Sequence, residues 1–118
     1  MYTNKELGEL GEKLAKKFLV ERDYEIICQN FRGRQGEIDI IAKDKDETIV
    51  FIEVKTRTSL EFGNPAEAVD DEKIEHIIKT AKYFLYCQNI KENNIRFDAI
   101  EVFIYKGRYR VNHIRQII

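Results

Sequence analysis

The sequence has few of the residues that disulfide-stapled, linker-rich or repetitive proteins need. Its 118 residues include one proline, two cysteines and no tryptophan. Cys28 and Cys87 lack the spacing of a metal site and a disulfide-dense context, so we expect two reduced thiols. Apart from a break around Pro65, in "FGNPAEAVDD", no linker, repeat or low-complexity tract is visible. We therefore expect residues 1–118 to form a single domain with its own core.

Long apolar runs are also missing. No run approaches the roughly twenty residues that a membrane span requires. The opening segment "MYTNKELGELGEK" has no apolar stretch of the kind found in signal peptides. We therefore expect a soluble, cytoplasmic protein that has no membrane partner.

A surplus of charge of one sign is a third absence. The net charge is -1, so the chain has no general attraction for nucleic acid, and any phosphate site must be local. Residues 102–118 nevertheless contain four basic residues and no acid. This asymmetry permits a basic face, although a solvated rim or Lys and Arg protecting a sheet edge would explain it equally well.

Hydrophobic periodicity predicts the order αβββαββ, a mixed sheet flanked by helices. The two central strands are rich in Ile and Val, and "NFRGRQG" is predicted to be a loop. The expected helices are residues 4–21 and 71–88, the latter capped by Asp70 or Asp71, and the expected strands are residues 24–29, 37–43, 48–56, 95–105 and 108–117.

Small residues lie beside the apolar stripe of the first predicted helix. Gly8, Gly11 and Ala15 cost helix propensity or add little packing, so they predict a close approach by another element or a ligand. Glu12 projects from the edge of this side.

The two central predicted strands carry charges inside apolar patterns. Because side chains alternate across a strand, the charged positions of each strand share one face. An antiparallel hairpin that matches the apolar faces restricts the register. The predicted pairs are Ile38 with Val54, Ile40 with Ile52, Ala42 with Val50, Ile41 with Phe51, Asp39 with Glu53, and Glu37 with Lys55.

This register makes the carboxylates of Asp39 and Glu53 cross-strand neighbours. Like charges so placed repel each other unless a cation bridges them or Lys55 and Arg57 neutralise them. A hard ion such as Mg²⁺ binds one or two carboxylates and substrate phosphate oxygens, and Lys55 could then assist an attacking water. The alternative is an ordinary solvated sheet face, on which Glu and Lys commonly alternate.

Several linked motifs resemble the YraN-like family of small bacterial proteins. They are "LGELGEKLAKKFL", "GEIDIIA", "VFIEVKTR", "FGNPAEAV", Lys73, "RFDAIEV" and "HIRQI", and together they span nearly the whole chain. That family is similar to the PD-(D/E)XK nuclease superfamily, and especially to archaeal Holliday junction resolvases. The resemblance implies a restriction-endonuclease-like αβββαβ core, with a site on the central hairpin and an added C-terminal strand.

The resemblance also implies roles for individual residues. Asp39 matches the metal-binding aspartate, and Glu53 with Lys55 matches the (D/E)-x-K element. Glu12 matches the first-helix glutamate of the metal site, and the backbone carbonyl of Val54 is a further expected ligand. The sequence departs from the PD-(D/E)XK motif at one position, because Ile38 stands in place of the proline that precedes the aspartate. This departure is common in resolvase-like branches and leaves the metal assignment in place.

Glu37 keeps two interpretations, a further ligand or the partner of Lys55. The candidates for phosphate contact are Arg32, Arg34, Arg57 and Thr58. His76 and His113 are far apart in sequence and have no zinc-type spacing, so surface roles are expected for both.

The expected activity is that of a Mg²⁺- or Mn²⁺-dependent endonuclease that hydrolyses phosphodiester bonds in DNA, branched or structured forms included. No base-reading motif is visible, so recognition by backbone shape is expected. Analogy with resolvases adds a homodimer. Two alternatives stay open: a non-catalytic nucleic-acid-binding or adaptor module on the same fold, and a structural, self-associating protein.

Overall fold

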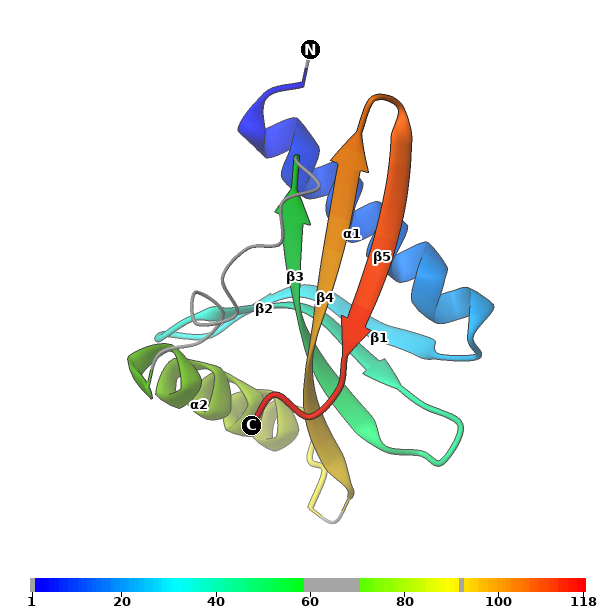
Figure 1. Ribbon diagram of the computed structural model, residues 1–118. Coiled ribbons are helices and arrows are strands. Elements are labelled where there is room, and N and C mark those ends of the chain that lie inside the picture. The colour runs from blue at the N-terminus through cyan, green and yellow to red at the C-terminus, as the bar shows by residue number, and fades with distance from the viewer. Residues whose placement is uncertain (1, 59–70, 92) are drawn as a thin grey trace.

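The computed structural model describes residues 2–58, 71–91 and 93–118, which form an α/β fold with helices on both faces of a twisted sheet (Figure 1). The elements occur in the predicted order αβββαββ. They are α1 (Asn4–Glu21), β1 (Glu25–Arg32), β2 (Glu37–Lys43), β3 (Ile49–Arg57), α2 (Asp71–Cys87), β4 (Ile95–Tyr105) and β5 (Arg108–Ile114).

The strands form one mixed sheet in the order β1-β2-β3-β4-β5. Neighbours are antiparallel except β3 and β4, which are parallel and are joined through α2. The predicted α/β class is therefore confirmed. The first six elements follow the αβββαβ order that the resemblance implied, and β5 is the added strand at the sheet edge.

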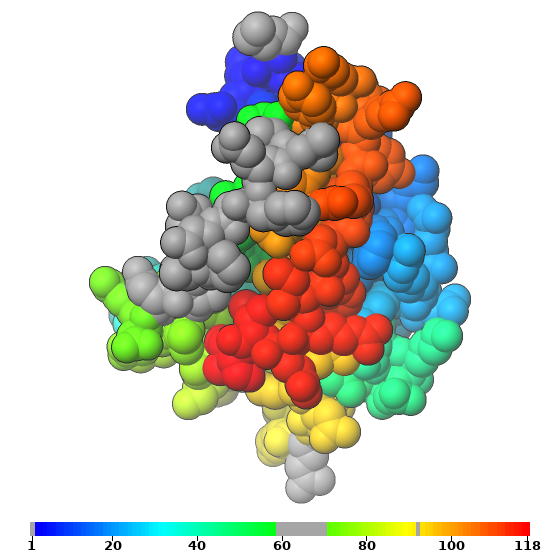
Figure 2. Space-filling view, viewed as in Figure 1, coloured from blue at the N-terminus to red at the C-terminus, as the bar shows by residue number. Residues whose placement is uncertain are grey.

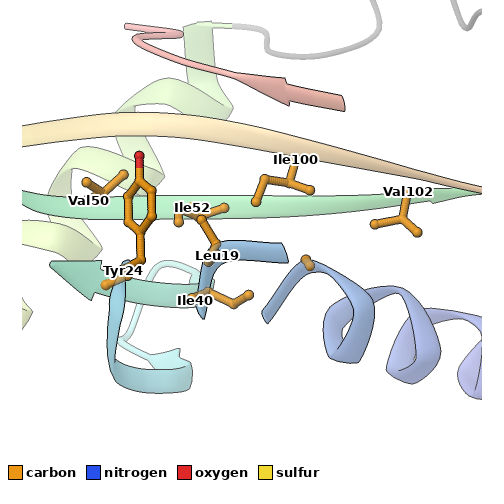
Figure 3. Close-up of a cluster of buried hydrophobic side chains, with 9 residues drawn as sticks. Leu19, Tyr24, Ile40, Val50, Ile52, Ile100 and Val102 are labelled. Atoms are coloured by element: carbon orange, nitrogen blue, oxygen red, sulfur yellow. The ribbon is translucent and has the colours of Figure 1, made fainter. Parts of the chain in front are cut away.

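The helix α1 begins at a capping box and covers one face of the sheet. The Thr3 hydroxyl accepts a hydrogen bond from the Glu6 backbone N–H, and the Glu6 carboxylate accepts one from the Thr3 N–H. Leu19 and the following Tyr24 then pack against β-branched residues of the sheet (Figure 3). The buried members of this first core cluster are Ala15, Leu19, Tyr24, Ile40, Ala42, Val50, Ile52, Ile100 and Val102.

The helix α2 covers part of the opposite face. Its apolar stripe, including Ala81 and Phe84, packs on the alternate residues of the central strands. The ring of Phe84 lies edge-on to Phe31 and Phe51 at centroid distances of 5.2 and 6.0 Å. The second core cluster consists of Ile38, Ile41, Ile49, Phe51, Ala81 and Phe84.

The small residue Gly11 marks the closest approach of α1 to the sheet. A Cβ atom at Gly11 would lie 1.9 Å from the Thr56 hydroxyl oxygen, whereas one at Gly8 would meet nothing within 4 Å. The predicted close approach of another element is therefore confirmed at Gly11. This close contact between Gly11 and Thr56 brings the neighbouring Glu12 near β3.

The predicted register of the β2–β3 hairpin is confirmed only in the half nearest the turn that joins the two strands. Ile40 pairs with Ile52, Ile41 with Phe51 and Ala42 with Val50, as predicted. The ladder between the described parts of β2 and β3 ends there, at Ile40 and Ile52. The predicted ladder pairs Asp39 with Glu53, Ile38 with Val54, and Glu37 with Lys55 are therefore wrong.

A local twist of β1 and β2 explains this error. Asn30 has a φ of 52°, a left-handed conformation that asparagine tolerates better than most residues. Its neighbours Gln29 and Phe31 pair with Ile40 and Ile38, so the twist falls opposite Asp39. Alternation predicted that Ile38 and Ile40 share a face. Ile38 packs instead in the cluster on the α2 side of the sheet, whereas Ile40 packs in the cluster on the α1 side.

Other sequence predictions have mixed outcomes. The segment "NFRGRQG" was expected to be a loop, but β1 continues through its first three residues to Arg32. Cys28 and Cys87 are free thiols, as expected. No described helix is long and apolar enough to cross a membrane. The predicted break around Pro65 and the candidate cap Asp70 lie outside the described residues.

A buried ionic network ties β4 to β5 and the C-terminus. Asp98, which has no exposed surface, accepts hydrogen bonds from the Arg96 guanidinium at 2.9 Å and the Gln116 backbone N–H at 3.0 Å. The His113 Nε2 lies 2.8 Å from the same carboxylate. Arg96 also donates to the Tyr24 hydroxyl at 2.9 Å. The expectation of a surface role for His113 is wrong, because this residue of the edge strand β5 contacts the buried carboxylate of Asp98.

We predict opposite effects for alanine at the two glycines of α1. Gly11→Ala should lower the free energy of unfolding by about 1–3 kcal/mol, because the new methyl forces the helix away from Thr56. Gly8→Ala should be neutral or should raise it by up to about 1 kcal/mol, since alanine favours the helix. Urea unfolding of both variants provides the measurement, and equal effects would contradict the close approach.

We also predict that Asp98→Ala lowers the free energy of unfolding by about 3–5 kcal/mol, because the charge of Arg96 loses its buried partner. Asp98→Asn keeps an acceptor and should cost less. The exposed Asp46→Ala is the matched control and should stay within about 0.5 kcal/mol of the parent protein. Urea unfolding again measures the difference, and a loss at Asp98 no larger than that at Asp46 would count against the network.

Candidate functional site

The candidate site lies where β2 parts from β3. Beyond the last ladder pair, the Asp39 carboxylate accepts a hydrogen bond of 2.8 Å from the backbone N–H of Val54. The N–H and C=O groups of one strand residue point to the same edge, so the carbonyl of Val54 is also directed toward β2. The side chain of Asp39 thus takes the place of a ladder partner, next to the backbone group that was expected to act as a ligand.

The surroundings of Asp39 disfavour its negative charge. Burial raises the pKa of its carboxyl group to about 7, and the hydrogen bond from Val54 only partly opposes this. The neighbouring carboxylates of Glu12, Glu53 and Glu37 contribute to this rise. Four carboxyl groups from α1, β2 and β3 therefore share one electrostatic environment.

Glu12 reaches this cluster from α1, as the resemblance implied. Burial raises the pKa of Glu12, a hydrogen bond with the Asp39 carboxyl group opposes the rise, and the charge of Glu37 adds to it. When its amide nitrogen faces the cluster, Asn30 donates to Glu12 Oε1 at 3.3 Å and to Glu37 Oε1 at 3.2 Å. The residue with the left-handed backbone thus also helps to hold the acids together.

Glu53 is turned toward α2. It forms an ion pair with Lys73, at the start of that helix. Its other carboxylate oxygen, Oε2, is buried and has no hydrogen-bond partner among the described residues. A buried carboxylate oxygen without a donor is costly, and a cation at this point would satisfy it.

Lys55 follows Glu53 on the same face of β3. Burial lowers the pKa of its ammonium group, the charge of Glu53 opposes this, and the charges of Lys73 and Arg57 lower it further. The face therefore carries one acidic and two basic groups, Glu53, Lys55 and Arg57, all partly withdrawn from water.

Glu37 lies beside the cluster and has partners on β1. It is the ladder partner of Arg32, and the two side chains form an ion pair of 3.5 Å. Arg32 is mostly exposed, at 79% of its side-chain surface, so this pair adds little stability. Through Asn30, Glu37 is also linked to the acidic cluster, and its two interpretations, a further ligand or the partner of Lys55, stay predictions.

The other candidate phosphate contacts lie on two sides of the site. Arg34 lines a groove of about 680 Å³ between the β1–β2 connection and α2, together with Arg32, Lys79 and Tyr83. Arg57 follows Lys55 by two residues on the same face of β3 and forms an ion pair of 3.7 Å with Glu101 of β4. Thr58 is exposed just after β3.

The structure therefore brings together six of the predicted residues, namely Glu12, Glu37, Asp39, Glu53, Val54 and Lys55. Arg32 and Arg34 lie in the groove next to α2, Arg57 is the last residue of β3, and Thr58 follows it.

Sequence reasoning gave no role to Lys73 or Asn30. Lys73 precedes Ile77 and Ala81 by one and two helical turns, so the stripe of α2 already placed it facing the sheet. No comparable pattern signals the backbone conformation of Asn30.

The donor chemistry of the site fits a hard divalent ion, because all its groups are carboxylate or carbonyl oxygens. In residues 2–58, 71–91 and 93–118, no three acidic, histidine or cysteine side chains are arranged as ligands of one ion. Asp39 and Glu53 instead engage Val54 and Lys73. The unsatisfied oxygen of Glu53 and the raised pKa of Asp39 are the features that a bound cation would relieve.

Comparisons with known proteins agree with the motifs. The model of the "Uncharacterised protein family UPF0102" matches residues 11–102. A UPF0102 protein of Caldicellulosiruptor bescii is 50% identical over 96% of this chain and 94% of its own length. One of Clostridioides difficile is 45% identical over 94% of this chain and 95% of its own.

One solved structure with a similar arrangement is the crystal structure of a repair endonuclease from Pyrococcus abyssi. The two share 20% sequence identity with a TM-score of 0.39, over 90% of this chain and 40% of the other, so this chain spans less than half of that protein. The match to the family model and the two full-length relatives decide the assignment: the chain belongs to the UPF0102 family, the YraN-like family that its motifs resemble.

Proposed function

We propose that this protein is a divalent-metal-dependent nuclease that hydrolyses phosphodiester bonds in DNA. The observation that carries the proposal is the meeting of Asp39, Glu53 and Lys55 where β2 and β3 part, with Glu12 beside them. Folding alone does not favour this cluster, because the acids repel one another and burial penalises every charge. A site for a cation and a phosphate group accounts for that cost.

Mg²⁺ or Mn²⁺ would be held by Asp39, Glu53, Glu12 and the backbone carbonyl of Val54. When bound, such an ion stabilises charge on a phosphate group and lowers the pKa of a coordinated water. Asp39 and Glu53 would bind it from two strands that β4 and α1 hold in place. The ion pair with Lys73 offsets the charge of Glu53 and so keeps the acidic site compatible with folding.

Lys55 would act on the substrate directly. Its half-buried ammonium group lies beside Glu53, and its lowered pKa brings it closer to the range in which a proton can be exchanged. A cation at this position would offset the negative charge that builds up on the phosphate oxygens, or would orient the attacking water.

Substrate contacts are proposed on both sides of the cluster. The groove lined by Arg32, Arg34 and Lys79 would bind the phosphate backbone on the α2 side, and Arg57 with Thr58 would do so at the end of β3. Backbone contacts of this kind read shape, which suits branched or structured DNA. A homodimer would present two such sites to a symmetric junction.

We predict that single-stranded, duplex, flap or four-way-junction DNA is cleaved in the presence of Mg²⁺ or Mn²⁺. Asp39→Asn and Lys55→Ala should each reduce the rate by a factor on the order of 10²–10³, the usual loss when one electrostatic group is removed from an active site. The matched controls Asp46→Asn and Lys45→Ala change the same residue types in the β2–β3 turn and should retain the rate.

Cleavage that persists in both site variants would come from a contaminant or another site and would refute the proposal. DNA binding that depends on salt, without cleavage and without binding of divalent ions, would favour the non-catalytic module. The engagement of Asp39 with Val54 and of Glu53 with Lys73 is the observation on which that second candidate rests.

We further predict that protons and divalent ions compete for Asp39. The raised pKa of Asp39 means that its contribution to stability is complete below about pH 4 and is lost as the pH rises through about 7. In EDTA, the melting temperature should therefore fall between pH 6 and pH 8, and Asp39→Asn should flatten this decrease. Adding Mg²⁺ should raise the melting temperature more at pH 8 than at pH 6.

The control for this experiment is Asp46→Asn, which should leave both the decrease and the Mg²⁺ effect unchanged. If Mg²⁺ stabilises Asp39→Asn as much as the parent protein, Asp39 is not a ligand.

A further inference from the structure

The hairpin of β4 and β5 carries a second groove that the proposed catalytic cluster does not use. It has a volume of about 460 Å³, and the described residues that line it are all basic or aromatic. Tyr105 and Tyr109 are 44% and 50% exposed. Figure 2 shows the hairpin, in orange, at the upper right of the visible face. The lining residues are Phe103, Tyr105, Lys106, Arg108, Tyr109 and Arg110.

The groove continues the sheet face that carries the candidate site. Arg57 pairs with Phe103 in the parallel β3–β4 ladder, and Phe103 pairs with Arg110 in the β4–β5 ladder. Residues two apart on a strand share a face, so Lys55 and Arg57 belong to the same surface. Adjacent strands lie about 4.8 Å apart, which places Arg110 roughly 10 Å across the sheet from Arg57.

Cations and aromatic rings are already in contact in this groove. The Arg110 guanidinium lies 5.2 Å from the centre of the Phe103 ring, and the Lys106 ammonium lies 5.3 Å from that of Tyr105. Tyr105 and Arg108 are direct cross-strand partners on either side of the hairpin turn. Aromatic faces beside guanidinium groups provide stacking surfaces for bases and charge for the phosphates between them.

Protection of a sheet edge explains only part of this arrangement. Lys and Arg on an edge strand do prevent aberrant pairing, and β5 is an edge strand. That role requires no exposed tyrosines, and exposed aromatic surface beside the cations would work against it. The combination has the chemistry of a single-stranded nucleic acid site and not that of an edge kept free of contacts.

We propose that the β4–β5 groove binds a single-stranded segment of nucleic acid, with a base stacked on Tyr105 and phosphates near Lys106 and Arg108. The groove would guide an unpaired strand to or from the cluster at the end of β3. This role in cleavage rests on the proposed function, whereas the binding itself does not. The favoured substrate class is accordingly DNA with a single-stranded arm.

The test is fluorescence anisotropy with a labelled mixed-sequence 20-nucleotide single strand and the corresponding duplex, at low salt and in EDTA. Tyr105→Ala should weaken single-strand binding about 5- to 100-fold, the range expected for losing one stacked base, and should leave duplex binding within about twofold. Arg108→Ala should weaken it and lower the salt slope by about 0.7, as expected for one phosphate contact on a single strand.

The matched controls are Tyr86→Ala and Lys45→Ala, at an exposed tyrosine of α2 and an exposed lysine of the β2–β3 turn. Neither should change single-strand binding. Circular dichroism and melting of each variant establish that it is folded. No single-strand binding by the parent protein would overturn the proposal, as would equal losses for strand and duplex in Tyr105→Ala.

Two further outcomes separate this inference from the proposed nuclease activity. Cleavage by the parent protein together with unchanged single-strand binding in Tyr105→Ala would refute the groove and leave the nuclease intact. Single-strand binding through Tyr105 without any cleavage in Mg²⁺ or Mn²⁺ would support the groove and refute the nuclease. If Tyr105→Ala instead converts a dimer to a monomer in sedimentation without affecting strand binding, the groove is an interface between copies and the proposal is wrong.

Discussion

The hydrogen bond from the Val54 backbone to the Asp39 carboxylate is the constraint on which the candidate site depends. A central strand must satisfy its N–H groups on both edges, and β3 loses β2 as a ladder partner beyond Ile52. Asp39 supplies the missing acceptor from its side chain. The strands can therefore part without leaving a buried N–H group unpaired, and the gap between them is the place where acidic side chains gather.

This solution is unfavourable electrostatically. A neutral acceptor would satisfy the N–H group of Val54 equally well. The residue present is nevertheless Asp39, which lies among three other carboxylates and has a pKa raised to about 7. Glu53 leaves one buried oxygen without a donor in the part of the chain that the structure describes. Two lysines, Lys55 and Lys73, limit the repulsion without removing it. Strain of this kind at a strand end is typical of sites whose missing partner is a ligand.

Regular periodicity made most of the fold predictable from the sequence. The helices and strands follow from apolar spacing, and the inner hairpin register follows from matching the faces of Ile40, Ala42, Val50 and Ile52. The prediction failed at Asp39 because alternation assumes a regular strand. The left-handed backbone of Asn30 breaks that regularity, and nothing in a single sequence distinguishes such an asparagine from one in an ordinary turn.

The same limit applies to partners chosen by tertiary structure. Sequence spacing brought Glu53 and Lys55 onto one face, but only the packing of α2 shows that Lys73 pairs with Glu53. Likewise, His113 looked like a surface residue because its partner Asp98 comes from the neighbouring strand. Local pattern specifies which face a side chain occupies, whereas the identity of its partner depends on how separate elements meet.

The distribution of charge across the sheet has a consequence for any polyanion that binds here. The cluster of Glu12, Glu37, Asp39 and Glu53 repels phosphate groups, so the cluster alone cannot attract nucleic acid. The basic surfaces lie on either side of it, in the groove of Arg32 and Arg34 and on the β4–β5 hairpin. A nucleic acid held by both surfaces would place its backbone over the acids, which then requires a cation between them. Metal and nucleic acid would accordingly bind cooperatively, because each reduces the electrostatic cost of the other.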